Sequence, residues 1–129
     1  MNHGGWRYVA ASVVGTSHVK MGGTCQDAND CQVYQLPSGE KVLVATVADG
    51  AGSAACGGEG AIRACSVLVG LVNDHLSSGN TVEQITAESA KFWISVIQSA
   101  LGKEAESVSR DRRDFACTLL VCCPGNTFT

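Results

Sequence analysis

An apolar segment that runs directly into a glycine-rich turn constrains the fold more than any other feature of this chain. Residues 41–48 (KVLVATVA) are rich in β-branched side chains and predict a strand. Apolar residues occupy both of its faces, so we expect a central strand that is covered on both sides. The glycines of residues 49–53 (DGAGS) then allow the backbone to approach a ligand closely.

Strand and turn signals before this segment predict a hairpin. Residues 6–14 (WRYVAASVV) are typical of a strand, and residues 15–30, which are polar and contain three glycines, are typical of a long loop. Residues 31–36 predict another strand, which a Pro-Ser-Gly turn joins to residues 41–48. Long loops in small domains are often functional, so residues 15–30 are a candidate binding segment.

Two long helices and a last strand are predicted in the rest of the chain. Apolar residues at helical spacing predict the first helix at residues 54–76 and the second at about 81–110. The second helix starts at a Thr-Val-Glu-Gln sequence of the capping-box type. A solvated charged tract at residues 110–114 (RDRRD) leads to a strand at residues 115–123 (FACTLLVCC), again apolar on both faces. Together these elements predict an α+β fold.

The position of the last predicted strand indicates a truncated domain. A buried strand needs neighbours on both sides, but only six residues follow residue 123. We therefore expect residues 1–129 to be a single domain that is the N-terminal portion of a larger one. An unpaired apolar edge at residues 115–123 would also make the chain self-associate.

Composition and charge argue against several classes of function. The chain has 12 acidic and 9 basic residues, a net charge of −3, which argues against a nucleic-acid partner bound by bulk charge. Its apolar runs are shorter than the ~20 residues that span a bilayer, so we expect no membrane association. The seven cysteines form no CxxC pair and no histidine lies at zinc-ligand spacing, which predicts reduced thiols and a cytoplasmic location.

The candidate site residues are two carboxylates. Asp49 ends the apolar strand, and the carbonyl oxygen of Gly50 follows it. Asp27 lies in the predicted loop before the hairpin. Carboxylate and carbonyl oxygens suit hard cations such as Mg²⁺ or Mn²⁺. Two structural alternatives stay open: Asp49 as the cap of the following helix, and Asp27 as an ordinary solvated side chain.

The order of these features resembles the metal-dependent serine/threonine protein phosphatases, the type 2C or PPM family, in a bacterial-like branch. The resemblance rests on four short segments in sequence order, GTSH, CQDA, ADGAGSA and FACTLL. It implies an αββα sandwich of antiparallel sheets flanked by helices. It also implies two Mn²⁺ or Mg²⁺ ions and a phosphorylated protein as substrate, whose phosphoserine or phosphothreonine is hydrolysed by a metal-activated water.

The resemblance assigns roles to the two carboxylates. It implies that Asp49 bridges both metals, that the Gly50 carbonyl binds one of them, and that Asp27 lies beside the second. The family's phosphate-binding arginine has no counterpart between residues 15 and 27, so Lys20 and His18 are the predicted phosphate contacts.

Three departures from the family pattern bear on activity. Gln26 stands where some relatives have a glutamate ligand, and Ala51 where some have a histidine. The chain also contains a single Asp-Gly pair, so the later aspartates of the family site are missing. We therefore expect an incomplete metal site, and weak or no activity of the chain alone.

Two other functions remain open at this point. One is an inactive phosphatase-like module that binds a partner or a phosphopeptide. The other is dinucleotide binding, because Gly50-x-Gly52-x-x-Ala55 fits the G-x-G-x-x-A fingerprint after a strand. That fingerprint requires a parallel βαβ unit, which the predicted hairpin does not provide.

Overall fold

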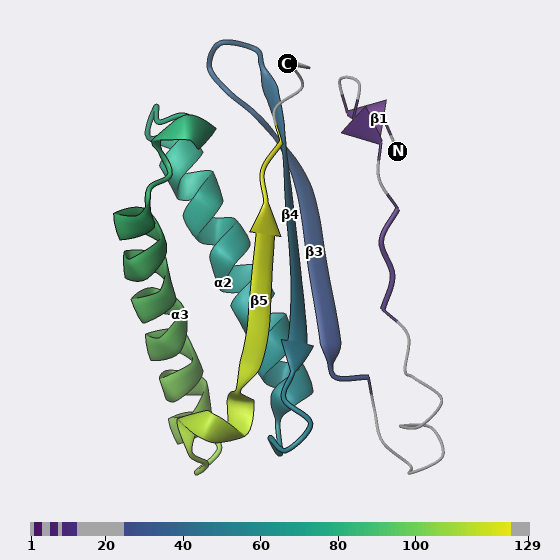
Figure 1. The fold of residues 1–129 in the computed structure, drawn as a ribbon, viewed down its shortest axis with the longest axis vertical. Helices are drawn as coiled ribbons and strands as arrows, with labels where there is room; N and C mark the ends of the chain where they lie inside the picture. The colour runs from purple at the N-terminus through teal and green to yellow at the C-terminus, as the bar shows by residue number, and fades with distance from the viewer. Residues whose placement is uncertain (1, 4–5, 8, 13–24, 125–129) are drawn as a thin grey trace.

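The computed structural model describes residues 2–3, 6–7, 9–12 and 25–124. Within them, a three-stranded antiparallel sheet in the order β3–β4–β5 is covered on one face by two helices, which confirms the predicted α+β class (Figure 1). The strands are β3 (Asp27–Gln35), β4 (Lys41–Gly50) and β5 (Cys117–Cys122). The helices are α2 (Gly57–Ser77), which packs on the sheet, and α3 (Ala87–Ser107), which packs on α2. The second sheet of an αββα sandwich remains a prediction.

The centre of the sheet is β4, as predicted, but only one of its faces is covered within the described residues. Val42, Val44 and Thr46 are buried against the helices. On the opposite face, Val47 is 51% exposed and Asp49 is also exposed. The prediction of cover on both sides is therefore wrong for the described residues, because apolar side chains on a second face do not themselves supply an element to pack there.

The start of β3 corrects the loop prediction for residues 15–30. The strand begins at Asp27, in full register with the end of β4, and Ala28 is buried. Aspartate and asparagine are depleted in strands, so the propensity of residues 27–30 indicated a loop, but backbone pairing with β4 decides the conformation. Residues 15–24 of the predicted loop lie outside the described residues.

The first predicted strand is also corrected. Over the described part of residues 6–14, strand structure covers only β2 (Trp6–Arg7), which pairs with β1 (Asn2–His3). Residues 9–12 are exposed and belong to no strand. Strand propensity reflects packing against neighbours, and these four residues have no sheet partner among those described.

The two predicted helices are confirmed, with shifted ends. The first begins at Gly57, three residues later than expected, and is followed by Gly79 at φ +89, a left-handed conformation that suits glycine. The capping sequence at Thr81 opens a short 3₁₀ helix, η1 (Val82–Gln84), in which the Gln84 side chain accepts a 2.7 Å bond from the Thr81 N–H. Thr86 then caps α3, its hydroxyl accepting from the Ser89 N–H.

The hydrophobic core lies between the sheet and the helical layer. Trp93, Ile97 and Leu101 of α3 reach the same buried cluster as Leu68 and Val72 of α2. No helix in the described part of the chain is long and apolar enough to cross a membrane.

The charged tract before the last strand is largely exposed, as predicted, and its second half forms a second 3₁₀ helix, η2 (Arg112–Phe115). The Asp114 carboxylate accepts a 3.2 Å bond from the Asp111 N–H, which closes this turn. Phe115 is buried beneath it and is not part of β5, so the predicted strand start at residue 115 is two residues early. The late start of β5 follows from the capping contacts between Asp111 and Asp114, which hold Phe115 in η2 and not in the strand.

Candidate functional site

The structure brings the two predicted carboxylates together. Asp27 and Asp49 are direct register partners at one end of the β3–β4 pair. Residues directly opposite in an antiparallel pair point to the same face, with Cβ atoms about 4.5–5.5 Å apart. Both side chains lie on the open face of the sheet and are exposed. A single site can therefore use both carboxylates.

Thr118 extends this pair into a row across the three strands. It is the register partner of Asp49 on β5 and is exposed on the same face. The sequence motifs did not indicate this residue, although it lies in the FACTLL segment. Successive side chains of a strand point to opposite faces. Cys117 and Leu119 pack on the buried face, so the Thr118 hydroxyl between them lies on the same face as the carboxylates.

A cavity of about 640 Å³ lies over this row. Its floor includes Asp27, Asp49 and Thr118, and residues 9–12 form one wall. The Asn29 amide donates a 2.8 Å hydrogen bond to the Ser12 hydroxyl, which ties this wall to β3. The row therefore faces an open depression large enough for a small ligand or the side chain of a peptide.

The turn after Asp49 is fixed by backbone contacts. The Gly50 N–H donates to the Gln26 carbonyl at 2.8 Å. A Cβ at Gly50 would lie 2.5 Å from the Gly57 backbone, so only glycine fits. The Ala51 N–H donates to the Ala116 carbonyl at 2.9 Å, which links the turn to β5. These bonds fix the position of the backbone that carries Asp49.

The structure excludes the capping alternative for Asp49. The N-cap of α2 is Cys56, with no side-chain capping bond, and Asp49 lies seven residues earlier at the end of β4. Asp49 therefore does not cap the helix.

The two predicted phosphate contacts lie outside the residues that the structure describes. His18 and Lys20 fall in residues 13–24, which are not among the described residues. Their assignment remains a prediction.

The fit of the site to a divalent cation is partial. Asp27, Asp49 and the Gly50 carbonyl belong to one strand end, and their oxygen atoms are the donors that Mg²⁺ and Mn²⁺ prefer. Within the described residues, no group of three or more His, Cys, Asp or Glu side chains could hold a metal ion. These residues could thus supply only part of the ligand set of a divalent cation.

Burial disfavours cysteine chemistry beside this row. All seven cysteines are free thiols. Burial, and to a smaller extent the neighbouring Cys65, raises the pKa of the Cys117 thiol. Burial also raises the pKa of Cys65. Because the thiolate is the nucleophilic form, these two thiols are poor nucleophiles, and the site offers carboxylate chemistry instead.

The pairing of β4 also bears on dinucleotide binding. The strand is antiparallel to both of its neighbours, and the sheet of the described residues contains no parallel pair. The glycine pattern of residues 50–55 therefore does not lie in a parallel βαβ unit, which the fingerprint requires.

Comparison with known proteins identifies the family of this chain. Residues 14–128 match the profile of the family described as Protein phosphatase 2C. Serine/threonine-protein phosphatase 3 of Escherichia coli (strain K12) is 38% identical over 115 residues, which cover 89% of this chain and 45% of that protein. The chain thus spans less than half the length of this curated relative. No solved structure matches it significantly. On this evidence, the chain belongs to the Protein phosphatase 2C family.

Proposed function

We propose that this chain carries part of the catalytic centre of a protein serine/threonine phosphatase, which hydrolyses phosphoserine and phosphothreonine in protein substrates. The observation that carries the proposal is the register pair of Asp27 and Asp49, in a chain of the Protein phosphatase 2C family. The name of the Escherichia coli relative supports the same reaction.

The two carboxylates of the pair lie directly opposite each other on neighbouring strands. Like charges directly opposite on neighbouring strands destabilise a sheet by about 0.2–1 kcal/mol. Asp27 and Asp49 occupy such positions on the open face. A cation shared by the two carboxylates would offset such repulsion, and this supports a metal-binding role for the pair.

The residues that would hold Mn²⁺ or Mg²⁺ are Asp27, Asp49 and the carbonyl of Gly50. When bound, such an ion supplies Lewis-acid activation of a water molecule and neutralises charge on the phosphoryl oxygens. The chain itself supplies orientation: β-sheet register fixes the two carboxylates, and the packed turn fixes Gly50.

The other side chains of the site would contact the substrate. The Thr118 hydroxyl can donate or accept a hydrogen bond, and its place beside Asp49 suits it to orient a water or a phosphoryl oxygen. Lys20 and His18 are proposed to bind the phosphate, through charge-assisted hydrogen bonds when they are protonated.

A second candidate function is a phosphatase-like module that binds a phosphopeptide without hydrolysing it. The incomplete ligand set of the described residues favours this alternative for the chain taken alone. The two functions differ in whether phosphate is released.

The test is phosphate release from a phosphothreonine peptide with saturating Mn²⁺. We expect slow release that requires the metal and falls by about a hundredfold or more in Asp49→Asn, since charge stabilisation by the ion is the main catalytic term. The matched control is Asp74→Asn, an exposed aspartate on α2, which should stay within about twofold of the parent because surface changes have small effects.

Two outcomes would contradict the catalytic proposal. Release that continues in excess chelator would rule out the metal. Equal rates of phosphate release by Asp49→Asn and by the parent would show that Asp49 has no role in the reaction. Peptide binding without any release would favour the binding module.

A further inference from the structure

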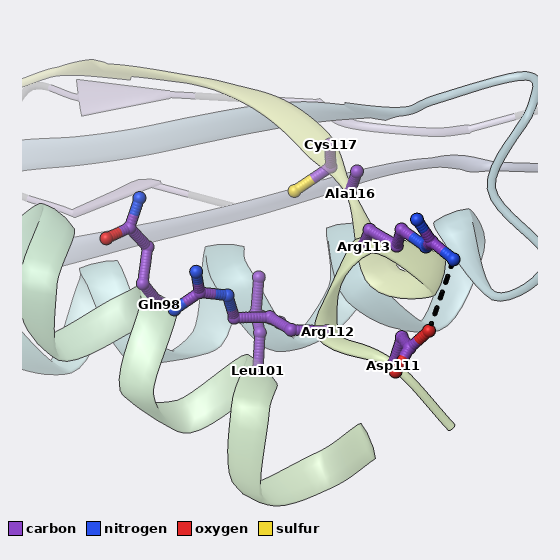
Figure 2. A pocket seen from close by; sticks show the side chains of 7 residues that line it. All are labelled: Gln98, Leu101, Asp111, Arg112, Arg113, Ala116 and Cys117. Atoms are coloured by element: carbon purple, nitrogen blue, oxygen red, sulfur yellow. Dashed lines mark ion pairs between the residues drawn. The ribbon is translucent and has the colours of Figure 1, made fainter.

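A second cavity lies on the helical side of the sheet, between α3, η2 and the start of β5 (Figure 2). Its volume is about 580 Å³. Its lining comes from α3, from η2 with the residue before it, and from the start of β5: Gln98, Leu101, Asp111, Arg112, Arg113, Ala116 and Cys117. The carboxylate row is not part of this lining, so the cavity is separate from the site described above.

The two arginines of the cavity differ in their partners. Arg113 forms a 3.4 Å ion pair with Asp111, which is the sole acidic residue of the described lining. Figure 2 shows Arg113 directed towards Asp111 and Arg112 directed the other way, towards Gln98. Arg112 forms no ion pair within the described residues. The cavity therefore contains one guanidinium whose charge is not compensated by a carboxylate.

The neighbours of Arg112 favour binding of an anion. The Gln98 side chain, which can donate two hydrogen bonds, lies on the same side of the cavity (Figure 2). Leu101 is buried and forms an apolar part of the wall together with Ala116. A guanidinium offers a planar pair of donors that matches a carboxylate or phosphate. Arg112 and Gln98 are both exposed, so a group on a peptide can reach them.

We propose that this cavity binds an oxyanion, the phosphoryl or carboxylate group of a peptide, with Arg112 as the charged donor and Gln98 as the second donor. The cavity borders the turn that follows Asp49, because the Ala116 carbonyl accepts the Ala51 N–H. An acidic peptide residue bound here would lie near the sheet end that carries the carboxylate row. Assigning that peptide to a phosphoprotein substrate rests on the proposed function.

The experiment measures binding to the full chain by calorimetry in excess chelator, so that hydrolysis does not interfere. The probes are a phosphothreonine peptide with flanking glutamates, the same peptide with alanine in place of each glutamate, and inorganic phosphate. We expect the acidic peptide to bind most tightly, and high salt to weaken its binding. Arg112→Gln should weaken it by about tenfold or more, as expected for loss of a charge-assisted hydrogen bond.

Three further variants make the result specific. Arg112→Lys keeps the charge but not the paired donors, so its loss should be intermediate. Gln98→Leu should produce a smaller loss than Arg112→Gln. The matched control is Arg63→Gln, an exposed arginine on α2 outside this cavity, which should bind as the parent does.

Several results would overturn the proposal. Equal losses in Arg112→Gln and Arg63→Gln would place the anion elsewhere. Equal affinity for inorganic phosphate and for the acidic peptide would show that the ligand is the free anion and not a peptide group. Absence of binding of all three probes would exclude the site, whether or not the chain hydrolyses phosphopeptides.

Discussion

At the scale of single residues, the site depends on glycines as much as on carboxylates. A Cβ at Gly50 would lie 2.5 Å from the carbon and oxygen of the Gly57 carbonyl and 2.8 Å from the Gln26 carbonyl oxygen. Backbone atoms cannot move aside as the end of a flexible side chain can. The contact between the end of β4 and the start of α2 therefore requires a glycine immediately after Asp49.

Gly50→Ala should destabilise the chain by about 1–3 kcal/mol, the usual cost of overpacking. Urea unfolding followed by circular dichroism measures the change. The control is Gly52→Ala in the same turn, where a Cβ would have no atom within 4 Å, so its effect should stay within about 0.5 kcal/mol. Equal stability of the two variants would mean that the close approach at Gly50 does not occur.

At the scale of elements, η2 joins the helical layer to the carboxylate turn. The Asp114 carbonyl accepts the Cys56 N–H at 2.7 Å, and a Cβ at Gly60 would lie 2.0 Å from the Phe115 carbonyl oxygen. Gly60 therefore lets the first turns of α2 approach η2, which positions the start of β5 and with it Thr118.

Two glycines of α2 should respond to alanine in opposite directions. Gly60→Ala should destabilise the chain by about 1–3 kcal/mol or more, because the new methyl group meets backbone. Gly70→Ala, at an exposed position with open space, should stabilise it by about 0.5–1 kcal/mol, since alanine is the better helix former. Thermal unfolding of both variants checks this, and a stabilising Gly60→Ala would contradict the packing described.

The sequence predicts the elements better than their pairing. Helical periodicity predicts α2 to within three residues at each end, because its buried stripe repeats over many turns. It places the start of α3 six residues too early, because the capping sequence at Thr81 opens η1 instead. Residues 27–30 were predicted as loop, since the register with β4, and not strand propensity, makes them a strand. Asp27 and Asp49 were selected by motif, but their adjacency is a property of that register. Thr118 required the structure, because a lone threonine in an apolar strand carries no motif of its own.

At the scale of the whole molecule, the open face of the sheet is apolar away from the carboxylate row. Val47 is 51% and Leu120 is 70% exposed, and the two are register partners. Within the described residues, β5 pairs only on the side of β4. An apolar face with a free strand edge is a template for association with another chain.

The chain should therefore self-associate at high micromolar concentration in reducing buffer. Leu120→Glu should reduce this association with little effect on stability, because the side chain is exposed. Ile62→Glu is the control: this residue of α2 is 64% exposed but lies away from the open face. Light scattering after size exclusion measures the mass, and a monodisperse parent monomer would contradict the prediction.

The central claim is that the register pair of Asp27 and Asp49 binds a divalent cation. The most direct measurement is Mn²⁺ titration of the full chain, followed by the electron paramagnetic resonance of free Mn²⁺. We expect weak binding, given the partial ligand set, and a further loss of about tenfold or more in Asp49→Asn and in Asp27→Asn, because affinity rises with ligand charge. Asp74→Asn should bind as the parent does. Equal Mn²⁺ affinity in all four proteins would contradict the claim.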